Sequence, residues 1–254
     1  MNILAVGATG SIGAHVIDEA LRQGHAVRAL VRKAGKVKPH PGLEVVVADL
    51  TQPQTLSAAV EGVDAVIFTH GTYGSPRDAE AVDYGGVRNV LWALSDHPAR
   101  IALMTAIAVT DRKGAHDWKR RGERLVRASG RPYTIVRPGW FDCNRRDQLQ
   151  LHFLQGDRRQ SGTPRDGAVA RRQIARVLVS SLTSQAADRK TLELVTEHGR
   201  EQADLDPLFA ALDADAAGAL DAIHDAANMP LDREPQTVLR DLENDYPESA
   251  ERSA

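Results

Sequence analysis

The sequence predicts an α/β fold in which a doubly wound parallel sheet carries helices on both faces. Three observations support this prediction. Six short apolar runs alternate with helical segments along the first 140 residues, as in chains built from successive strand–helix–strand units. A glycine-rich turn follows the first apolar run directly, and an amphipathic run follows that turn. With 254 residues, 42% of them hydrophobic, the chain is long enough for one sizeable core with a small appendage.

The glycine-rich turn is the most informative motif in the chain. The first predicted strand and the turn after it are Ile3–Val6 and Gly7-Ala8-Thr9-Gly10-Ser11-Ile12-Gly13. Strand, glycine-rich turn and helix is the geometry that presents backbone N–H groups to a pyrophosphate at the start of a helix. We expect Gly7 to allow the tight turn, Gly10 to let the backbone approach phosphate, and Gly13 to let the helix lie close to the sheet. Thr9 and Ser11 add hydroxyl donors.

The next three predicted strands end in polar residues that a bound dinucleotide would meet, because the carboxyl ends of parallel strands share one edge of the sheet. These strands are predicted over residues 26–31, 43–48 and 63–69. Arg32 follows the second strand, where a cation suits the 2′-phosphate of NADP, although Lys33 can share this role. Asp49 follows the third strand, and it either accepts a hydrogen bond from adenine, or caps the helix expected near Pro53, or does both. His70 follows the fourth strand, where we expect it to pack beside the cofactor or meet solvent.

The remaining segments continue the alternation and then become less regular. Helices are predicted over residues 82–91, 118–126 and 173–182, strands over 100–105, 133–137 and 191–195, a loop over 156–167, and one or two helices over 205–223. The helix over 118–126 carries many cations, which we expect to form a solvated face. The chain therefore divides into a dinucleotide-binding domain over residues 1–200, including substrate-side loops, and an acidic, partly helical extension over residues 201–254.

Charge is distributed unevenly along the chain, although the formal net charge is only −2. Residues 203–254 carry 13 acidic and 3 basic side chains, a net charge of −10, which leaves +8 for residues 1–202. We expect this acidic tail either to lie on a basic face of its own body or of a second subunit, or to form a solvated extension. The basic run over residues 112–131 is a possible signal of nucleic-acid binding. Aromatic residues are sparse there, however, and the acidic tail opposes such binding.

The composition also predicts a soluble, cytoplasmic protein without a metal centre. Met1 leads directly into the first strand, which leaves no room for a signal peptide, and no apolar run approaches the ~20 residues that cross a bilayer. The single cysteine, Cys143, excludes an internal disulfide, and we expect it to be a buried, inert thiol. The nine histidines form no metal-binding pair with a carboxylate.

Several motifs, taken in order, resemble those of atypical short-chain dehydrogenases/reductases, the NAD(P)-binding group related to biliverdin reductase B and the NmrA-like proteins. The matching segments cover about the first 200 residues: Gly7 to Gly13, Leu30-Val31-Arg32, Ala48-Asp49-Leu50, Asp64-Ala65-Val66-Ile67, Lys119 to Glu123 and Ser129 to Gly139. The resemblance implies a Rossmann fold with NADP(H) as its cofactor. It implies cofactor contacts from the glycine loop, the strand ends and one helix: Gly7, Thr9, Gly10, Ser11, Ile12, Arg32, Asp49, Leu50, Thr69, His70, Gly71, Lys119, Pro138 and Gly139.

The catalytic residues typical of this family are only partly present. Short-chain dehydrogenases use a serine, and a tyrosine four residues before a lysine, and the tyrosine hydroxyl passes a proton to the carbonyl. Lys119 would need a tyrosine where the chain has Ala115, and the serine position holds Thr105 followed by Ala106. The resemblance therefore leaves Lys119 and Thr105 as candidate catalytic residues, and Lys119 also as a candidate for the cofactor ribose. Four other side chains are alternative proton donors among which spacing selects none: Tyr73, Tyr84, His116 and Asp117.

Two functions follow, one catalytic and one not. The first is an NADPH-dependent reductase that transfers hydride to a small carbonyl, enone, quinone-like or tetrapyrrole substrate. Its pocket is expected above the carboxyl ends of the strands, closed by residues 142–165 and lined by Tyr73, Thr105, Trp140 and Phe141. The second is a redox sensor of the NmrA type, which binds NADP(H) without turnover. As partners we expect a small-molecule substrate, no membrane and no nucleic acid, and the protein is expected to be a monomer or homodimer.

Overall fold

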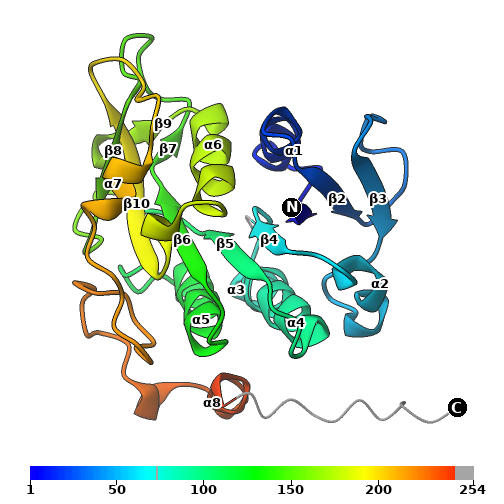
Figure 1. Ribbon diagram of the computed structural model, residues 1–254. Helices are drawn as coiled ribbons and strands as arrows, with labels where there is room; N and C mark the ends of the chain where they lie inside the picture. Colours follow the sequence, from blue (N-terminus) through cyan, green and yellow to red (C-terminus); the bar gives the residue numbers. More distant parts are fainter. Residues whose placement is uncertain (73, 244–254) are drawn as a thin grey trace, which may run out of the picture.

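The computed structural model describes residues 1–72 and 74–243, and in them the chain forms an eight-stranded sheet between two layers of helices (Figure 1). The strand order is β3-β2-β1-β4-β5-β6-β10-β8, and only β8, which pairs with β10, runs antiparallel to its neighbour in this described part. The strands are β1 Asn2–Val6, β2 Ala26–Val31, β3 Leu43–Val47, β4 Ala65–Phe68, β5 Arg100–Met104, β6 Tyr133–Pro138, β8 Gln150–Leu154 and β10 Lys190–Glu197. A second, two-stranded sheet pairs β7 Trp140–Phe141 with β9 Ala168–Val169.

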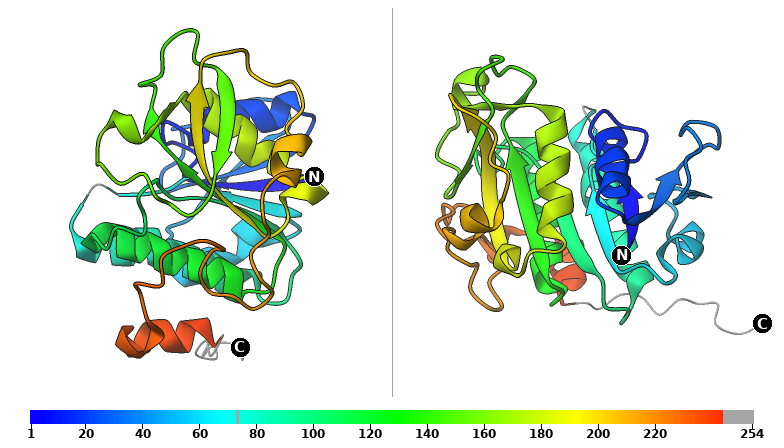
Figure 2. Two further views of the ribbon diagram at one scale, coloured as in Figure 1. Left: turned by 90° about the vertical axis from the view of Figure 1, so that its left-hand side faces the viewer. Right: turned by 45° about the horizontal axis from the view of Figure 1, so that its top comes forward.

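Helices cover both faces of the large sheet. Their bounds are α1 Gly13–Arg22, α2 Ser57–Val60, α3 Pro76–Asp78, α4 Gly85–Leu94, α5 Gly114–Ala128, α6 Arg171–Ser181, α7 Asp206–Ala210 and α8 Gln236–Leu242, with a π-helical segment, Ala79–Tyr84, between α3 and α4. On one face α1 and α6 close an apolar core that includes Val16 and Ile174, whereas α4 and α5 close a second core with Val90 and Leu125 on the other (Figure 2). Each of these helices has apolar residues at helical spacing, so each presents one apolar stripe to the sheet.

The structure confirms the predicted doubly wound α/β fold, and each predicted strand matches an observed strand to within two residues at either end. Strands β7, β8 and β9 were not predicted: β7 and β9 have only two residues each, and β8 lies in the irregular region after Gly139. Two helix predictions need correction. The helix expected near Pro53 is a single 3-10 turn, Pro53–Thr55, followed by the short α2. Over the described residues 205–223 only the five-residue α7 forms.

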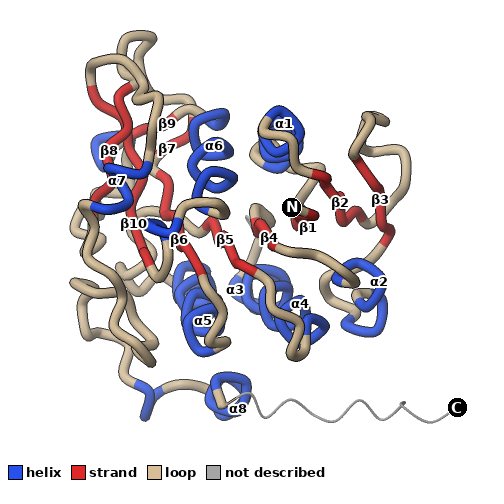
Figure 3. Tube along the Cα trace, viewed as in Figure 1, coloured by secondary structure: helices blue, strands red, loops and turns tan. Residues whose placement is uncertain are grey.

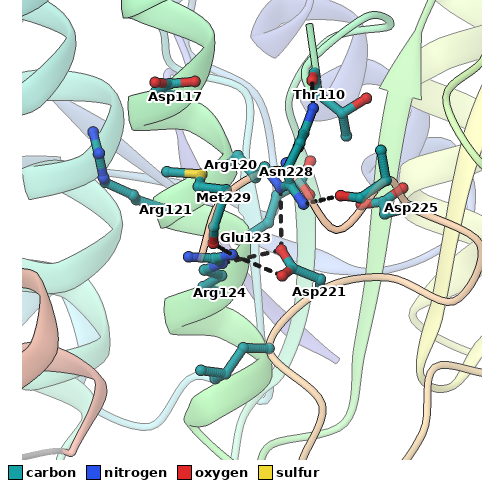
Figure 4. Close-up of polar contacts among 12 residues, drawn as sticks. Thr110, Asp117, Arg120, Arg121, Glu123, Arg124, Asp221, Asp225, Asn228 and Met229 are labelled. Carbon is teal, nitrogen blue, oxygen red and sulfur yellow. Dashed lines mark hydrogen bonds and ion pairs between the residues drawn. The ribbon is translucent and has the colours of Figure 1, made fainter. Parts of the chain in front are cut away.

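The C-terminal strap, residues 213–243, contacts α5 and is mostly irregular until it ends in α8 (Figure 3). Its carboxylates meet arginines of α5, and Asp221 Oδ1 accepts from Nε of both Arg120 and Arg124, at 3.1 and 3.0 Å (Figure 4). Arg120 also donates to the side chain of Asn228, and Arg124 donates to the carbonyl oxygen of Met229. The strap is therefore bound to α5 through both side chains and backbone.

The solvated face expected for the cations of α5 is wrong. Four of its arginines are at most 9% exposed: Arg120, Arg121, Arg124 and Arg127. A buried guanidinium is tolerated only when it is paired, and the acidic strap supplies the partners. The described part of the acidic tail therefore lies on a basic face of its own body. Residues 244–254 lie outside the described residues. These four arginines are also not available to the phosphates of a nucleic acid.

Candidate functional site

The glycine loop connects β1 to α1 and contacts the backbone that follows β4. Gly7 has φ +86°, a conformation that favours glycine, and a Cβ there would lie 2.6 Å from the backbone nitrogen of His70. A Cβ on Gly13 would lie 2.1 Å from the carbonyl oxygen of Gly7. The N–H of Gly10 donates to that same oxygen at 2.8 Å. The backbone itself therefore requires Gly7 and Gly13, and it closes the loop tightly.

Free backbone amides stand at the start of α1. The N–H groups of Ser11, Ile12 and Gly13 have no acceptor among the described residues, and no side chain caps this helix. The side chains of Thr9 and Ser11 are exposed beside them. Unsatisfied N–H groups at the positive end of a helix bind phosphate oxygens well, so the residues present fit the diphosphate of a dinucleotide.

The ends of β2 and β3 carry the predicted adenine-side residues. Arg32 is exposed after β2 and forms no hydrogen bond or ion pair with the described residues. Asp49 follows β3, and its Oδ1 accepts hydrogen bonds from the N–H and hydroxyl of Thr51, which lower the pKa of Asp49. The predicted helix cap is wrong, because the turn at Pro53 begins at Gln52 without a side-chain cap. The adenine contact stays a prediction.

Beyond β4, the side chains of Thr69 and His70 are held by the backbone. The hydroxyl of Thr69 donates to the carbonyl oxygen of Val6 at 3.1 Å. Nε2 of His70 lies 3.0 Å from the carbonyl oxygen of Val82, which can only accept, so Nε2 carries a proton. Burial, aided by the charge of Lys119, lowers the pKa of His70 to about 4, and the ring is therefore neutral at pH 7.

Lys119 lies at the edge of the sheet, and not on a solvated helix face. Its Nζ lies 3.2 Å from Oδ2 of Asp83, and the two side chains are 18% and 2% exposed. A Cβ on Gly71 would lie 3.3 Å from both of these side chains. Burial raises the pKa of Asp83, although Lys119 opposes the shift. His70, Asp83, Thr105 and Lys119 line one small recess, so the fold brings these predicted residues together.

The hydroxyl of Thr105 donates to Oε1 of Glu123 at 2.6 Å. Burial alone would raise the pKa of Glu123, but the neighbouring guanidinium groups of Arg137 and Arg127, together with Thr105, hold it at about 2. Glu123 is therefore an anion, and it accepts the hydrogen bond that the Thr105 hydroxyl donates. This commitment disfavours Thr105 as a proton donor to a substrate.

A cavity of about 250 Å³ lies at the carboxyl ends of β5 and β6. Trp140 and Phe141 line it, as expected for the substrate pocket. Gly162 and Asp166 also line it, and Gly162 belongs to the segment expected to close it. The lining also includes Ile107, Asp111, Lys113, His116, Pro138 and Gly139. Thr105 lies in the neighbouring recess instead, and Tyr73 lies outside the described residues.

The other candidate proton donors differ in their surroundings. The hydroxyl of Tyr84 donates to Asp241 of the strap at 2.6 Å, in a buried contact. Asp117 forms an ion pair with Arg112 at 3.0 Å. His116 alone among these described candidates lines the 250 Å³ cavity.

Three further predictions concern cysteine chemistry, metals and membranes. The prediction of a buried thiol is wrong, because Cys143 is exposed in the loop after β7. Among the described residues, no cluster of three or more histidine, cysteine or acidic side chains could hold a metal ion. Within the same residues, every helix is too short or too polar to cross a membrane.

Arg171, the first residue of α6, is a candidate cofactor ligand that motif analysis missed. Its Nε donates to Oγ of Ser11 at 3.2 Å, and its guanidinium lies 5.3 Å from the centre of the Phe141 ring. It also forms an ion pair with Asp142. These contacts fix a cation beside the free amides of the glycine loop. Arg171 is 160 residues away from Ser11 in the chain, and no motif links the two.

Glu193 is a buried acid that makes stability depend on pH. Its Oε2 accepts the N–H of Asp157 at 3.1 Å, and its Oε1 lies 3.5 Å from Nη1 of Arg137. Burial raises the pKa of Glu193 from its usual 4.5 to about 8. Between these two values the folded protein keeps a proton that the unfolded chain releases, so this group lowers stability progressively as the pH rises.

We expect Glu193→Gln to remove this dependence, because an amide is uncharged throughout the range. The Tm of the variant should resemble that of the unaltered protein near pH 4.5 and exceed it increasingly toward pH 8, as measured by thermal unfolding. Glu197→Gln, an exposed change on the same strand, should leave the pH profile as it is. Parallel Tm curves for Glu193→Gln and the unaltered protein would contradict the raised pKa.

Residues 7–185 match the family model described as NAD(P)H-binding, a span of more than half of the chain. The chain therefore belongs to the NAD(P)H-binding family. This match confirms the resemblance to atypical short-chain dehydrogenases/reductases that the motifs indicated.

Known proteins resemble this chain in sequence or in structure. The chain is 27% identical over 216 residues to an uncharacterized sugar epimerase, YhfK, of Bacillus subtilis (strain 168), which covers 76% of this chain and 94% of that protein. The oxidoreductase ylbE from Lactococcus lactis superposes with a TM-score of 0.69 at 16% identity, covering 84% of this chain and 96% of that one. The NADPH-dependent quinone oxidoreductase QOR2 from Escherichia coli, complexed with NADPH, has a TM-score of 0.58 at 19% identity, with 80% and 78% covered. These structures confirm the Rossmann fold.

Proposed function

We propose that this protein is an NADPH-dependent reductase of small carbonyl, enone, quinone-like or tetrapyrrole compounds. The observation that carries the proposal is the pairing of two features at one edge of the sheet. The free amides of residues 11–13 fit a diphosphate, and the 250 Å³ cavity beside Pro138 and Gly139 fits a small substrate. The likeness to a quinone oxidoreductase supports a quinone-like substrate.

Three parts of the cofactor have candidate partners in this chain. The amides of residues 11–13 and the guanidinium of Arg171 bind the diphosphate, Arg32 binds the 2′-phosphate and Lys119 binds the ribose. NADPH, when bound, supplies the hydride. The protein orients the substrate against the apolar side chains of Trp140 and Phe141.

A turnover assay tests this proposal. Oxidation of NADPH is followed at 340 nm with menadione, 9,10-phenanthrenequinone, FMN, 4-nitrobenzaldehyde and biliverdin, while calorimetry measures NADPH binding. Oxidation that depends on at least one of these compounds supports the reductase. Binding without any turnover favours the sensor described below, and absence of binding contradicts both functions.

Cofactor preference gives a separate prediction. We expect the protein to bind NADPH more tightly than NADH, and Arg32→Glu to abolish or reverse this preference by weakening NADPH binding at least ~10-fold, because charge-assisted bonds to the 2′-phosphate are lost. Calorimetric Kd values check this result. Lys33→Glu, a neighbouring charge reversal, should have the smaller effect. Equal affinities for NADPH and NADH in the unaltered protein would contradict the role of Arg32.

A redox sensor of the NmrA type is the second candidate function. Two observations favour it: the tyrosine position holds Ala115, and the hydroxyl of Thr105 is committed to Glu123. Such a protein would bind NADP(H) in the same loop and signal through a partner. For either function, a cytoplasmic location and a monomeric or homodimeric state stay predictions.

A further inference from the structure

A histidine and a carboxylate form a pair in the wall of the 250 Å³ cavity. Nδ1 of His116 lies 2.9 Å from the carbonyl oxygen of Ala108 and 3.0 Å from Oδ1 of Asp111. Because a carbonyl oxygen can only accept, Nδ1 carries a proton that the two oxygens share. Nε2 has no hydrogen bond with the described residues, and His116 and Asp111 both line the cavity.

A buried acid fixes the loop that holds this pair. Asp157 accepts the N–H of Ala108 at 2.6 Å and the N–H of Thr110 at 2.8 Å, and it is 1% exposed. The carbonyl oxygen of Ala108, which orients the His116 ring, is therefore part of a rigid segment. Rigid support of this kind is what a catalytic side chain requires.

His116 lies between the cavity and the residues that are candidates for cofactor binding. His116 precedes Lys119 by three residues in α5, so the two side chains are neighbours on one face of the helix. Lys119 reaches Gly71, just beyond the end of β4, whereas His116 reaches the cavity. Pro138 and Gly139, which are candidate cofactor contacts, line the same cavity. A compound bound there would meet both His116 and the cofactor.

We infer that His116 is the proton donor of the proposed reductase and that Asp111 positions it; the inference rests on the proposed function. With a carbonyl substrate, the ring first takes a second proton from solvent at Nε2 and then gives it to the carbonyl oxygen while the carbonyl carbon receives a hydride. The C=O π bond breaks, one C–H and one O–H bond form, NADPH becomes NADP⁺, and the ring returns to its neutral form.

The surroundings of His116 favour it over the other candidates. The hydroxyls of Thr105 and Tyr84 are bound to buried carboxylates, and neither residue lines the cavity. The charged groups that share the cavity with His116 are Asp111, Lys113 and Asp166, and Lys113 forms an ion pair with Asp111. A histidine held by a carboxylate through Nδ1 and free at Nε2 is arranged for proton transfer at Nε2.

The first arm of the test needs no cofactor. Nitrogen-15 NMR of the free protein at pH 8, with the signal assigned by its loss in His116→Gln, reports which ring nitrogen carries the proton. We expect the neutral ring of His116 to be the Nδ1–H tautomer. The opposite tautomer would overturn the inference, because Nδ1 would then lack the proton that Ala108 and Asp111 share, and Asp111 would not position the ring.

The second arm measures turnover with the best compound of the panel. His116→Gln is expected to lower kcat at least ~100-fold with little change in the Kd of NADPH, and added imidazole should partly restore the activity of His116→Ala. Asp111→Asn should lower kcat less and leave KM nearly unchanged. The matched control is His198→Gln, because His198 pairs with Asp147 at the same 3.0 Å on the exposed surface.

The two arms separate the inference from the proposed function. If the unaltered protein oxidises NADPH with none of the compounds, the reductase fails and the proton donor fails with it. If the unaltered protein is active and His116→Gln keeps its full kcat, only the role of His116 is overturned.

Discussion

Replacing Arg137 by methionine is expected to lower the free energy of unfolding by ~3–5 kcal/mol. Arg137 lies in β6 and is fully buried. Its Nη2 is 2.6 Å from Oε2 of Glu123 and 2.7 Å from Oδ2 of Asp225. Methionine fills most of the same volume but leaves Asp225 without this cation, and leaves Glu123 with only Arg127, at 3.5 Å. Urea unfolding followed by circular dichroism measures the loss.

An exposed ion pair provides the matched control for this prediction. Arg22 pairs with Glu19 one turn away in α1, and the arginine side chain is 66% exposed. Arg22→Met should cost less than ~1 kcal/mol, because Arg22 is solvated and Glu19 keeps a hydrogen bond from Gln23 after the pair is lost. If Arg137→Met and Arg22→Met had the same small effect, Arg137 would not be the charge that holds the buried cluster together.

Arg137 also connects the strap to the candidate site. Asp225 of the strap binds Arg137, Arg137 binds Glu123, and Glu123 accepts the hydroxyl of Thr105. The recess that contains Thr105 and Lys119 therefore rests on a charged cluster that residues far along the chain complete. A change in the strap can alter the site through this cluster without touching a ligand.

The parts of the site that the sequence predicted are local in the chain. The first strand, the glycine loop and α1 lie within 22 residues, and sterics at Gly7 and Gly13 fix their geometry. Their pattern therefore carries its own structural context. The ends of β2, β3 and β4 were predictable for a related reason, since parallel strands that follow one another end at the same edge.

The rest depended on contacts between distant residues. Arg120 and Asp221 are 101 residues apart, and the cations of α5 have the same spacing that a solvated helix face would have. The position of Arg171 beside Ser11 is equally invisible in a linear pattern. The signal that pointed toward the strap was the charge asymmetry, because a net charge of −10 over the last 52 residues needs a basic partner or solvent. Composition alone does not choose between the two.

Ending the chain at residue 212 is expected to abolish cooperative folding, which also tests the predicted division at residue 200. The truncation removes the partners of buried arginines in α5 and β6, and it removes Val238 from the core beneath α8. Asp215 is lost as well, and with it the ion pair to Arg127 at 3.1 Å and the hydrogen bond from the hydroxyl of Tyr133 at 2.9 Å. Breaking one buried pair costs ~3–5 kcal/mol, so losing several exceeds the ~5–15 kcal/mol by which a typical domain is stable.

Near-UV circular dichroism and urea unfolding of the truncated chain measure this outcome, and a synthetic peptide of residues 213–243 added in trans should restore part of the folded signal. An intermediate variant, Asp221→Asn with Glu234→Gln, keeps the strap and its backbone contacts while it neutralises two partners of α5. It should fold with reduced stability, because the arginines keep hydrogen-bond acceptors but lose their counter-charges. A truncated chain that unfolds cooperatively at the same urea concentration as the full chain would show that residues 1–212 are stable alone and that the strap is an accessory.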